Sequence, residues 1–202
     1  MSHYFDSPTG PAGPLGSVEL QVGPRALTLR TAAGVFARDG LDKGTAVLLD
    51  EAPPPPTTGH LLDLGCGYGP IALTLAARSP GATVWAVDVN ERARELCAAN
   101  AEEAGLGNVR VVDDVPEDVR FAAIWSNPPI RIGKQALHEL LLRWLPRLSD
   151  DGVALMVVQK NLGSDSLQRW LTENGWPTER LTSRNAFRVL RTTRGAPAPT
   201  TR

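Results

Sequence analysis

The stretch Leu61-Leu62-Asp63-Leu64-Gly65-Cys66-Gly67-Tyr68-Gly69-Pro70 joins a short apolar run to a turn that contains three glycines. An apolar run of this length is typical of a buried strand, and glycine lets the backbone turn sharply and lets a ligand lie against it. The next run, Ile71 to Arg78, has the apolar spacing of a helix. A strand, a glycine turn and a helix in this order predict one unit of a parallel sheet.

Strand and helix patterns continue to alternate from His60 to about Arg194, which predicts an α/β fold with helices on both faces of a mostly parallel sheet. The chain ends in two short apolar segments that predict an antiparallel pair. The expected strands are 61–64, 84–87, 109–112, 122–125, 153–158, 179–181 and 187–191, and the expected helices are 71–78, 91–104, 135–145 and 166–174.

The two ends of the chain differ from this central part. Residues 1–51 predict a small N-terminal β appendage, with strands at 18–22 and 26–29 around Gly23-Pro24 and a helix at about 41–49. Successive prolines make residues 52–59 a stiff connector. We expect residues 60–194 to form the main domain and residues 195–202, rich in Ala, Pro and Thr, to be a disordered tail.

The spacing of the glycine turn indicates its ligand. A dinucleotide site requires Gly-x-Gly-x-x-Gly, whereas this turn is Gly65-x-Gly67-x-Gly69 and follows Asp63. An acid here would repel a pyrophosphate but could hold the ammonium of an amino-acid moiety, directly or through water. The turn therefore favours S-adenosylmethionine (SAM) over a nicotinamide cofactor, the alternative being a purely structural turn.

Further acids fit the adenosine part of such a ligand. Asp88 ends the next apolar run, where a carboxylate can accept hydrogen bonds from both ribose hydroxyls. Beyond the third predicted strand, either Asp113 or Asp114 could reach the adenine amino group. The predicted cofactor-binding set is completed by neighbours in the same turns: Cys66, Tyr68, Val89 and Asn90.

A loop with specific chemistry, Asn127-Pro128-Pro129-Ile130, follows the fourth predicted strand. Ligands of open α/β sheets bind at this end of the strands, and two prolines make the loop rigid and rich in carbonyl acceptors. If the side-chain oxygen of Asn127 and the main-chain oxygen of Pro128 accept the N–H groups of an exocyclic amine, its lone pair faces the methyl donor. We therefore predict these four residues as catalytic, with Asn127 also beside SAM and the target base flipped or unpaired. A chance Pro-Pro turn is the alternative.

Together these motifs resemble the small-domain class I SAM-dependent methyltransferases, a family that includes the 16S rRNA guanine-N2 methyltransferase C and its single-domain relatives. The resemblance also covers Gly34-Val35-Phe36, residues 41–45 and Gly133-Lys134. It implies a Rossmann-like class I fold with a seven-stranded sheet, SAM as methyl donor, and guanine N2 of small-subunit rRNA as substrate. It also implies that Phe36 and residues 41–45, Thr45 among them, help to cover the SAM pocket.

The chain departs from the family at one position of the loop and in its length. Many members carry an aromatic residue after Asn-Pro-Pro that stacks on the target base, whereas Ile130 offers only an apolar contact. The rRNA enzyme also has an additional N-terminal domain. Binding of a ribosomal subunit is therefore expected to depend on the N-terminal appendage and on a basic C-terminal face.

The formal net charge of −1 does not itself favour a nucleic-acid partner. From Arg169 onward, however, arginines outnumber acids. We predict RNA-phosphate contacts at Arg184 and Arg188, and at Arg131 and Lys134 near the catalytic loop, the alternative being solvated side chains.

Composition narrows the remaining classes of protein. Two cysteines, Cys66 and Cys97, are too few for a disulfide framework or a four-ligand zinc site, so no metal is expected. There is no signal-peptide pattern and no run of roughly 20 apolar residues, which predicts a cytoplasmic protein without a membrane partner, as a monomer or weak dimer. Methylation of adenine N6 or of a protein glutamine is an alternative activity, and a non-catalytic SAM-binding RNA or ribosome-assembly module is an alternative of another class.

Overall fold

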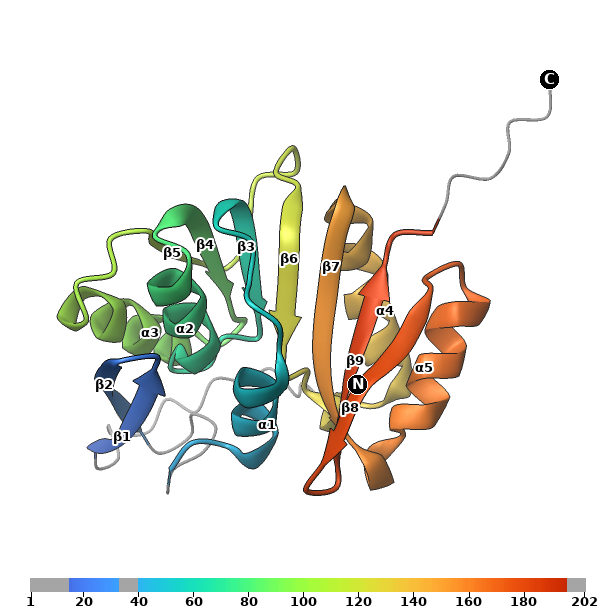
Figure 1. The fold of residues 1–202 in the computed structure, drawn as a ribbon, viewed down its shortest axis with the longest axis horizontal. Coiled ribbons are helices and arrows are strands. Elements are labelled where there is room, and N and C mark those ends of the chain that lie inside the picture. Colours follow the sequence, from blue (N-terminus) through green and yellow to red (C-terminus); the bar gives the residue numbers. More distant parts are fainter. Residues whose placement is uncertain (1–14, 33–39, 196–202) are drawn as a thin grey trace.

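A computed structural model describes residues 15–32 and 40–195 of the chain. It contains one seven-stranded sheet, in the order β5-β4-β3-β6-β7-β9-β8, and a separate two-stranded sheet (Figure 1). The strands are β1 (Leu15–Val22), β2 (Arg25–Ala32), β3 (Thr58–Leu64), β4 (Gly81–Val87), β5 (Val109–Val112), β6 (Phe121–Ser126), β7 (Leu148–Gln159), β8 (Thr178–Arg184) and β9 (Phe187–Thr193).

The large sheet is parallel from β5 to β7 and antiparallel beyond it, because β9 pairs antiparallel with both β7 and β8. This confirms the predicted Rossmann-like class I sheet with an antiparallel C-terminal part. Most elements begin or end a few residues away from the predicted bounds. β3 begins at Thr58, inside the predicted connector, and β7 begins at Leu148, which pairs with Phe121 ahead of a register shift.

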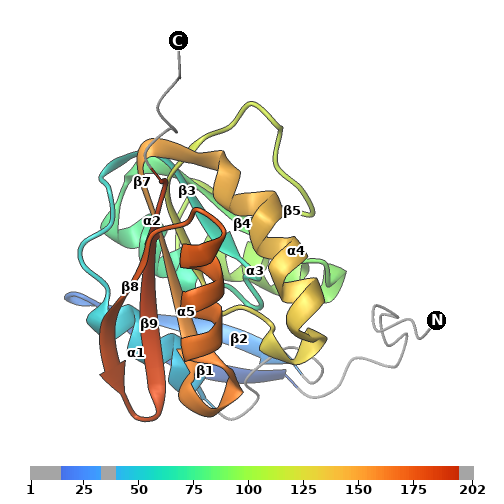
Figure 2. The same cartoon turned by 90° about the vertical axis from the view of Figure 1, so that its right-hand side faces the viewer.

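Helices cover both faces of the sheet (Figures 1 and 2). One core cluster joins apolar residues of α1, α2 and α3 to one face, and a second joins α4 and α5 to the other. Each face therefore has its own apolar layer, as the alternating strand and helix patterns predict. The helices are α1 (Lys43–Glu51), α2 (Pro70–Arg78), α3 (Glu91–Glu103), α4 (Lys134–Trp144) and α5 (Ser164–Glu173), with short 3₁₀ turns η1 (Ile130–Ile132), η2 (Leu145–Arg147) and η3 (Lys160–Leu162).

The strand order reverses at β3, so the carboxyl ends of β3 and β6 lie side by side. From β3 the chain moves outward through β4 and β5, and then returns to the other side of β3 with β6. Ligands of open α/β sheets bind at such a reversal. The glycine turn follows β3 and the Asn-Pro-Pro loop follows β6, so the topology brings the two motifs together. In Figure 1, β6 points toward the bottom of the view, where α1 lies.

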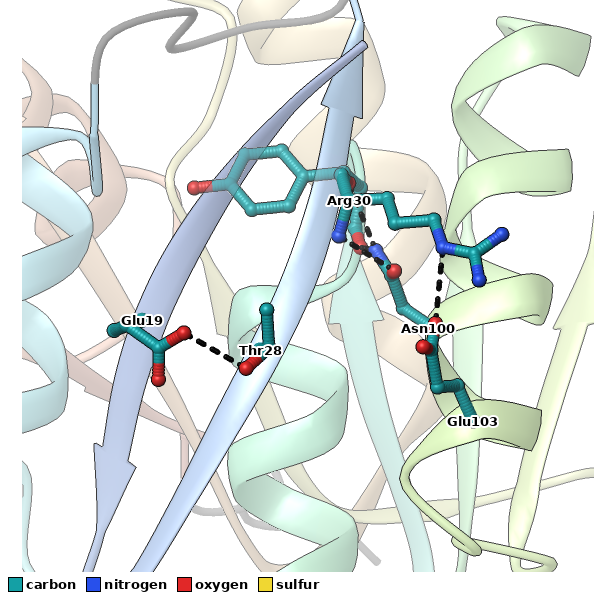
Figure 3. A network of polar contacts seen from close by, with 6 residues as sticks. Glu19, Thr28, Arg30, Asn100 and Glu103 are labelled. Atoms are coloured by element: carbon teal, nitrogen blue, oxygen red, sulfur yellow. Dashed lines mark hydrogen bonds and ion pairs between the residues drawn. The ribbon is translucent and has the colours of Figure 1, made fainter.

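The β1–β2 hairpin packs into the same core as the large sheet. Leu20 and Leu29 of the hairpin belong to the cluster that contains Leu61 and Ile71. Asn100 of α3 fixes this arrangement, because its amide accepts from the Arg30 N–H at 2.8 Å and donates to the Arg30 carbonyl at 3.0 Å (Figure 3). The N-terminal strands are therefore anchored on α3.

Some predictions fall on parts of the chain that the structure does not describe. Phe36 lies outside the described residues, and so does the predicted tail apart from Gly195. Among the helices that are described, none is long and apolar enough to cross a membrane.

Candidate SAM site and catalytic loop

The glycine turn is tied to the end of β4. The N–H groups of Gly65 and Cys66 both donate to the Val87 carbonyl, at 2.8 and 2.9 Å. Gly65 and Gly67 have positive φ, and a Cβ added at either would meet no described protein atom within 4 Å. A ligand could therefore approach the backbone closely at these two residues.

Gly69 has a different role from the first two glycines. It has φ 98° and caps the start of α2, and an added Cβ would lie 2.7 Å from Cys97 Sγ and 2.9 Å from Leu73 Cδ1. Glycine here lets α2 and α3 approach each other. Gly69, predicted as a cofactor contact, thus lies on the packed side of the turn.

Asp88 organises the turn from the end of β4. Its carboxylate accepts from Gly67 N–H and from Asn90 N–H, both at 2.9 Å. Asn90 in turn caps α3 by accepting from Arg92 N–H at 3.0 Å. Between them, Val89 is 72% exposed. An apolar side chain this open beside Asp88 is free to contact a ligand.

Asp63 is a buried acid with an unused oxygen. It is 0% exposed, one carboxylate oxygen accepts from Ala72 N–H at 2.8 Å, and the other has no hydrogen-bond partner among the described residues. Burial raises the pKa of Asp63 from 3.8 to about 8, while the Ala72 bond lowers it and Asp88 raises it further. A cationic group that reached this oxygen would favour the ionised form of Asp63 and lower its pKa.

The structure separates the two acids after β5. Asp114 forms an ion pair with Arg143 of α4 at 2.7 Å and also accepts from Val115 N–H. Asp113 is exposed and directly follows β5. Of the two acids, Asp114 is therefore the one already engaged by protein groups.

The Asn-Pro-Pro loop is held rigidly against the glycine turn. Ser126 Oγ donates to the Leu64 carbonyl at 2.6 Å, which joins the ends of β6 and β3. The Pro128 carbonyl accepts from Ile130 N–H at 2.8 Å around Pro129, whose φ −74° and ψ 73° are those of an inverse γ-turn. The Pro128 carbonyl keeps its second lone pair for another donor.

The Asn127 amide is held by two residues from the start of α1. Asn127 Nδ2 donates to Asp42 Oδ1 at 2.7 Å and lies 3.0 Å from Thr45 Oγ1. Thr45, predicted as part of the SAM cover, is buried and contacts the Asn-Pro-Pro loop. The family resemblance placed Asp42 only within the segment expected to cover SAM and did not predict its contact with Asn127, although its position as a helix cap ahead of Thr45 marks it as a side chain with a fixed direction.

Comparisons with known proteins place this arrangement in a family. Residues 26–191 match the model of the methyltransferase small domain. The chain belongs to this family. It is 34% identical over 176 residues to the uncharacterized protein YbxB of Bacillus subtilis, covering 85% of this chain and 88% of that protein.

Two further relatives carry an RNA methyltransferase name. The ribosomal RNA small subunit methyltransferase C of Klebsiella pneumoniae is 39% identical over 137 residues, which are 65% of this chain but 40% of that protein. The chain thus matches about two fifths of that relative's length. A 16S rRNA N2 methyltransferase of T. thermophilus, solved with AdoMet and guanosine, has a TM-score of 0.73 at 21% identity, over 89% of this chain and 50% of that one. This structural likeness supports the class I fold.

SAM is the methyl donor of the methyltransferase small-domain family, and the residues of this chain fit it. The open backbone at Gly65 and Gly67 can accept the ligand, the unused oxygen of Asp63 suits its ammonium group, and Val89 is free to contact an adenine. Asp88 lies between these points.

A small cavity adjoins the Asn-Pro-Pro loop at Ile130. It has a volume of about 130 Å³ and lies between Ile130, the start of α4 and the start of α5. Lys134, His138 and Leu162 contribute to its lining. Burial, and then the charge of Lys134, lower the pKa of His138, which stacks on Trp170 with ring centroids 3.5 Å apart. The cavity thus combines apolar walls with an exposed cation.

The predicted substrate-binding cations differ in their surroundings. Arg184 pairs with Asp50 and Glu51 of α1 at 3.3 and 3.0 Å. Arg188 is 7% exposed and pairs with Asp165, so a phosphate would have to compete with that carboxylate. Lys134 is exposed, and Arg131 lies in the η1 turn next to Ile130. Lys134 is therefore more accessible to a ligand at the loop than Arg184 or Arg188.

Proposed function

We propose that this methyltransferase transfers a methyl group to the exocyclic amino group of a nucleic-acid base, with guanine N2 of small-subunit rRNA as the leading substrate. The observation that carries the proposal is the rigid Asn127-Pro128 acceptor pair at the carboxyl end of β6, joined to the glycine turn through Ser126 and Leu64. The rRNA methyltransferase relatives support the choice of substrate.

The loop supplies what an exocyclic amine lacks. Its nitrogen is a poor nucleophile because the lone pair is delocalised into the ring. Asn127 Oδ1 and the free lone pair of the Pro128 carbonyl would accept its two N–H groups and turn the lone pair toward the methyl donor. These hydrogen bonds strengthen as positive charge develops on the nitrogen. The nitrogen then releases one proton to solvent, so no general base is required before transfer.

SAM, when bound, supplies a sulfonium methyl group that leaves without the S–C bonding pair, and the residues of the chain hold and orient the reactants. Asp88, Val89 and Asp113 would contact the adenosine part, and Asp63 the ammonium group. Cys66, Tyr68 and Asn90 would support these contacts from the same turns. Ile130 and the adjoining cavity would offer apolar contact to the target base. Lys134 would meet a neighbouring phosphate.

Labelled-methyl transfer tests the proposal. The substrates are small ribosomal subunits and naked rRNA from a strain that lacks this gene, and the products are identified by nucleoside mass spectrometry. N2-methylguanosine in rRNA is the expected product. N6-methyladenosine, or label in protein, would instead support the alternative substrates, which the same loop chemistry could serve.

An Asn127→Ala variant separates catalysis from binding. We expect it to abolish transfer while SAM affinity, measured by calorimetry, stays within a few fold of the wild type, because the loop's acceptor pair acts on the amine. Equal activity in the variant would rule out the proposed role of Asn127. No transfer by the wild type to any substrate, with SAM binding intact, would favour a non-catalytic RNA or assembly module.

A further inference from the structure

The start of α1 provides two hydrogen-bonding groups to one amide. Asp42 Oδ1 accepts from Thr45 N–H at 2.9 Å, which caps the helix, and also from Asn127 Nδ2 at 2.7 Å. Thr45 Oγ1 lies 3.0 Å from the same nitrogen. The two residues are separated from Asn127 by 85 and 82 positions in the chain.

These contacts determine which way the Asn127 amide faces. A carboxylate oxygen can only accept, so the nitrogen of the amide must be the atom that faces Asp42. Both N–H groups of Nδ2 then have partners, and the amide oxygen Oδ1 lies on the opposite side. In the opposite orientation, Asn127 would present N–H groups to an amine substrate, which also carries N–H groups.

We infer that Asp42, together with Thr45, is a positioning residue that holds Asn127 with Oδ1 toward the substrate and increases the negative charge on that oxygen. The inference rests on the proposed function, because it assigns a reason for the amide's orientation. A charge-assisted hydrogen bond to the N–H side of an amide polarises its carbonyl, since linked hydrogen bonds strengthen one another. Asn127 Oδ1 thereby becomes a better acceptor as the amine gains positive charge.

Capping alone does not require this residue type. A serine at position 42 could accept from Thr45 N–H and cap α1, but it lacks the length to reach Asn127 as well. Gly44 leaves room for the longer side chain, because an added Cβ there would lie 3.0 Å from Asp42 Oδ1. The structural role and the positioning role can therefore be separated by substitution.

Four variants test the inference, with kcat measured at saturating SAM and RNA. Asp42→Ser keeps the cap, so we expect an unchanged Tm and SAM affinity within about fivefold, but a fall in kcat of about 30- to 100-fold, as for other lost orienting contacts. Asp42→Asn keeps an acceptor but loses the charge, and we expect a loss of less than about tenfold. Thr45→Val removes the hydroxyl and should lower kcat, whereas Thr45→Ser keeps the hydroxyl and should have a kcat close to that of the wild type. The control is Asp118→Ser, at an exposed acid before β6, which should leave kcat unchanged.

A spectroscopic measurement keeps this inference separate from the proposed function. The ¹H–¹⁵N signals of the Asn127 side chain, assigned by their loss in Asn127→Ala, should show slow exchange with water in the wild type and fast exchange in Asp42→Ser. Slow exchange with no base methylation by the wild type would support the amide's fixed orientation and contradict the proposed function. Base methylation with kcat in Asp42→Ser within threefold of the wild type would overturn the positioning role.

Discussion

Asn100 of α3 donates a hydrogen bond to the carbonyl of Tyr68 at 2.8 Å, within the glycine turn. The same buried amide exchanges two hydrogen bonds with the backbone of Arg30 in β2 (Figure 3). One side chain therefore connects the N-terminal hairpin, α3 and the turn that is expected to hold SAM. This connection links the stability of the hairpin to the shape of the cofactor site.

Asn100→Ala should reduce both stability and SAM affinity. It leaves three backbone groups without their partner, and we expect a loss of about 2–4 kcal/mol in the free energy of unfolding. SAM binding should weaken severalfold, because the Tyr68 carbonyl is no longer held. Urea denaturation and calorimetry measure the two effects.

The control for this variant removes a neighbouring exposed contact. Glu103 pairs with Arg30 at 3.0 Å, and both side chains are about half exposed. Glu103→Gln should therefore cost less than about 1 kcal/mol. A similar loss of stability in the two variants would contradict the role given to Asn100.

Gly69→Ala should lower the stability of the fold by more than the strain of a positive φ alone would cause. Its φ is 98°, and the added Cβ would overlap Cys97 Sγ and Leu73 Cδ1. We expect a loss of about 3 kcal/mol, from the strained backbone and the overpacking together. Gly105→Ala is the matched control, because Gly105 has φ 67° with nothing within 4 Å, and should cost about 1–2 kcal/mol. Equal Tm values for the two variants would exclude a packing role for Gly69.

The pKa of Asp63 predicts how stability varies with pH. The pKa rises from 3.8 to about 8 on folding, so between these values the folded chain binds a proton that the unfolded chain does not. This contribution is fully present below pH 3.8 and is lost as the pH rises through about 8. Relative to Asp63→Asn, the wild type should lose up to about 1.4 kcal/mol per pH unit within this window. If the free energies of unfolding of the two proteins change with pH in parallel between about pH 6 and 9, the raised pKa of Asp63 would be contradicted.

The same group makes SAM binding sensitive to pH. The ammonium group of the ligand would lower the pKa of Asp63, so SAM should bind with release of a proton near pH 7 and more tightly as the pH rises toward 8. Calorimetry in two buffers of different ionisation enthalpy measures the released proton. Methylthioadenosine lacks the amino-acid moiety and should release none. An equal release with both ligands would assign the proton to another group.

The sequence predicts the parts of the site that follow from local pattern and sheet topology. Strands of one parallel sheet end at the same edge, so the residues after β3, β4 and β6 had to meet there. That rule alone brings Gly65, Asp88 and Asn127 together. The fold prediction was correct for the same reason, with differences confined mainly to element ends, where pairing partners such as Phe121 and Leu148 decide the bounds.

Long-range packing explains what the sequence did not predict. The contact of Asp42 with Asn127 depends on where α1 packs against the sheet. The apolar periodicity of the sequence does not indicate this position. The arginine excess near the C-terminus was visible, but its partners were not. Arg184 meets acids of α1, and Arg188 meets an acid of α5. Counting charges along the chain therefore does not report which cations already pair with acids of the fold.

If the substrate is RNA, Lys134 should contribute more to its binding than the C-terminal arginines do. Lys134 is exposed beside the cavity at Ile130 and forms no ion pair within the described residues, whereas Arg191 pairs with Glu179 at 2.9 Å. An unpaired cation at the loop can release a counterion from a phosphate, while a paired one must first give up its partner. Lys134→Gln should weaken RNA binding and lower the slope of log K against log salt by about 1. Arg191→Gln should change the affinity and the salt slope by much less. Filter binding at salt concentrations between about 50 and 200 mM measures the affinity and the slope for each variant. A larger loss of RNA affinity in Arg191→Gln than in Lys134→Gln would indicate that RNA binds at the C-terminal strands instead.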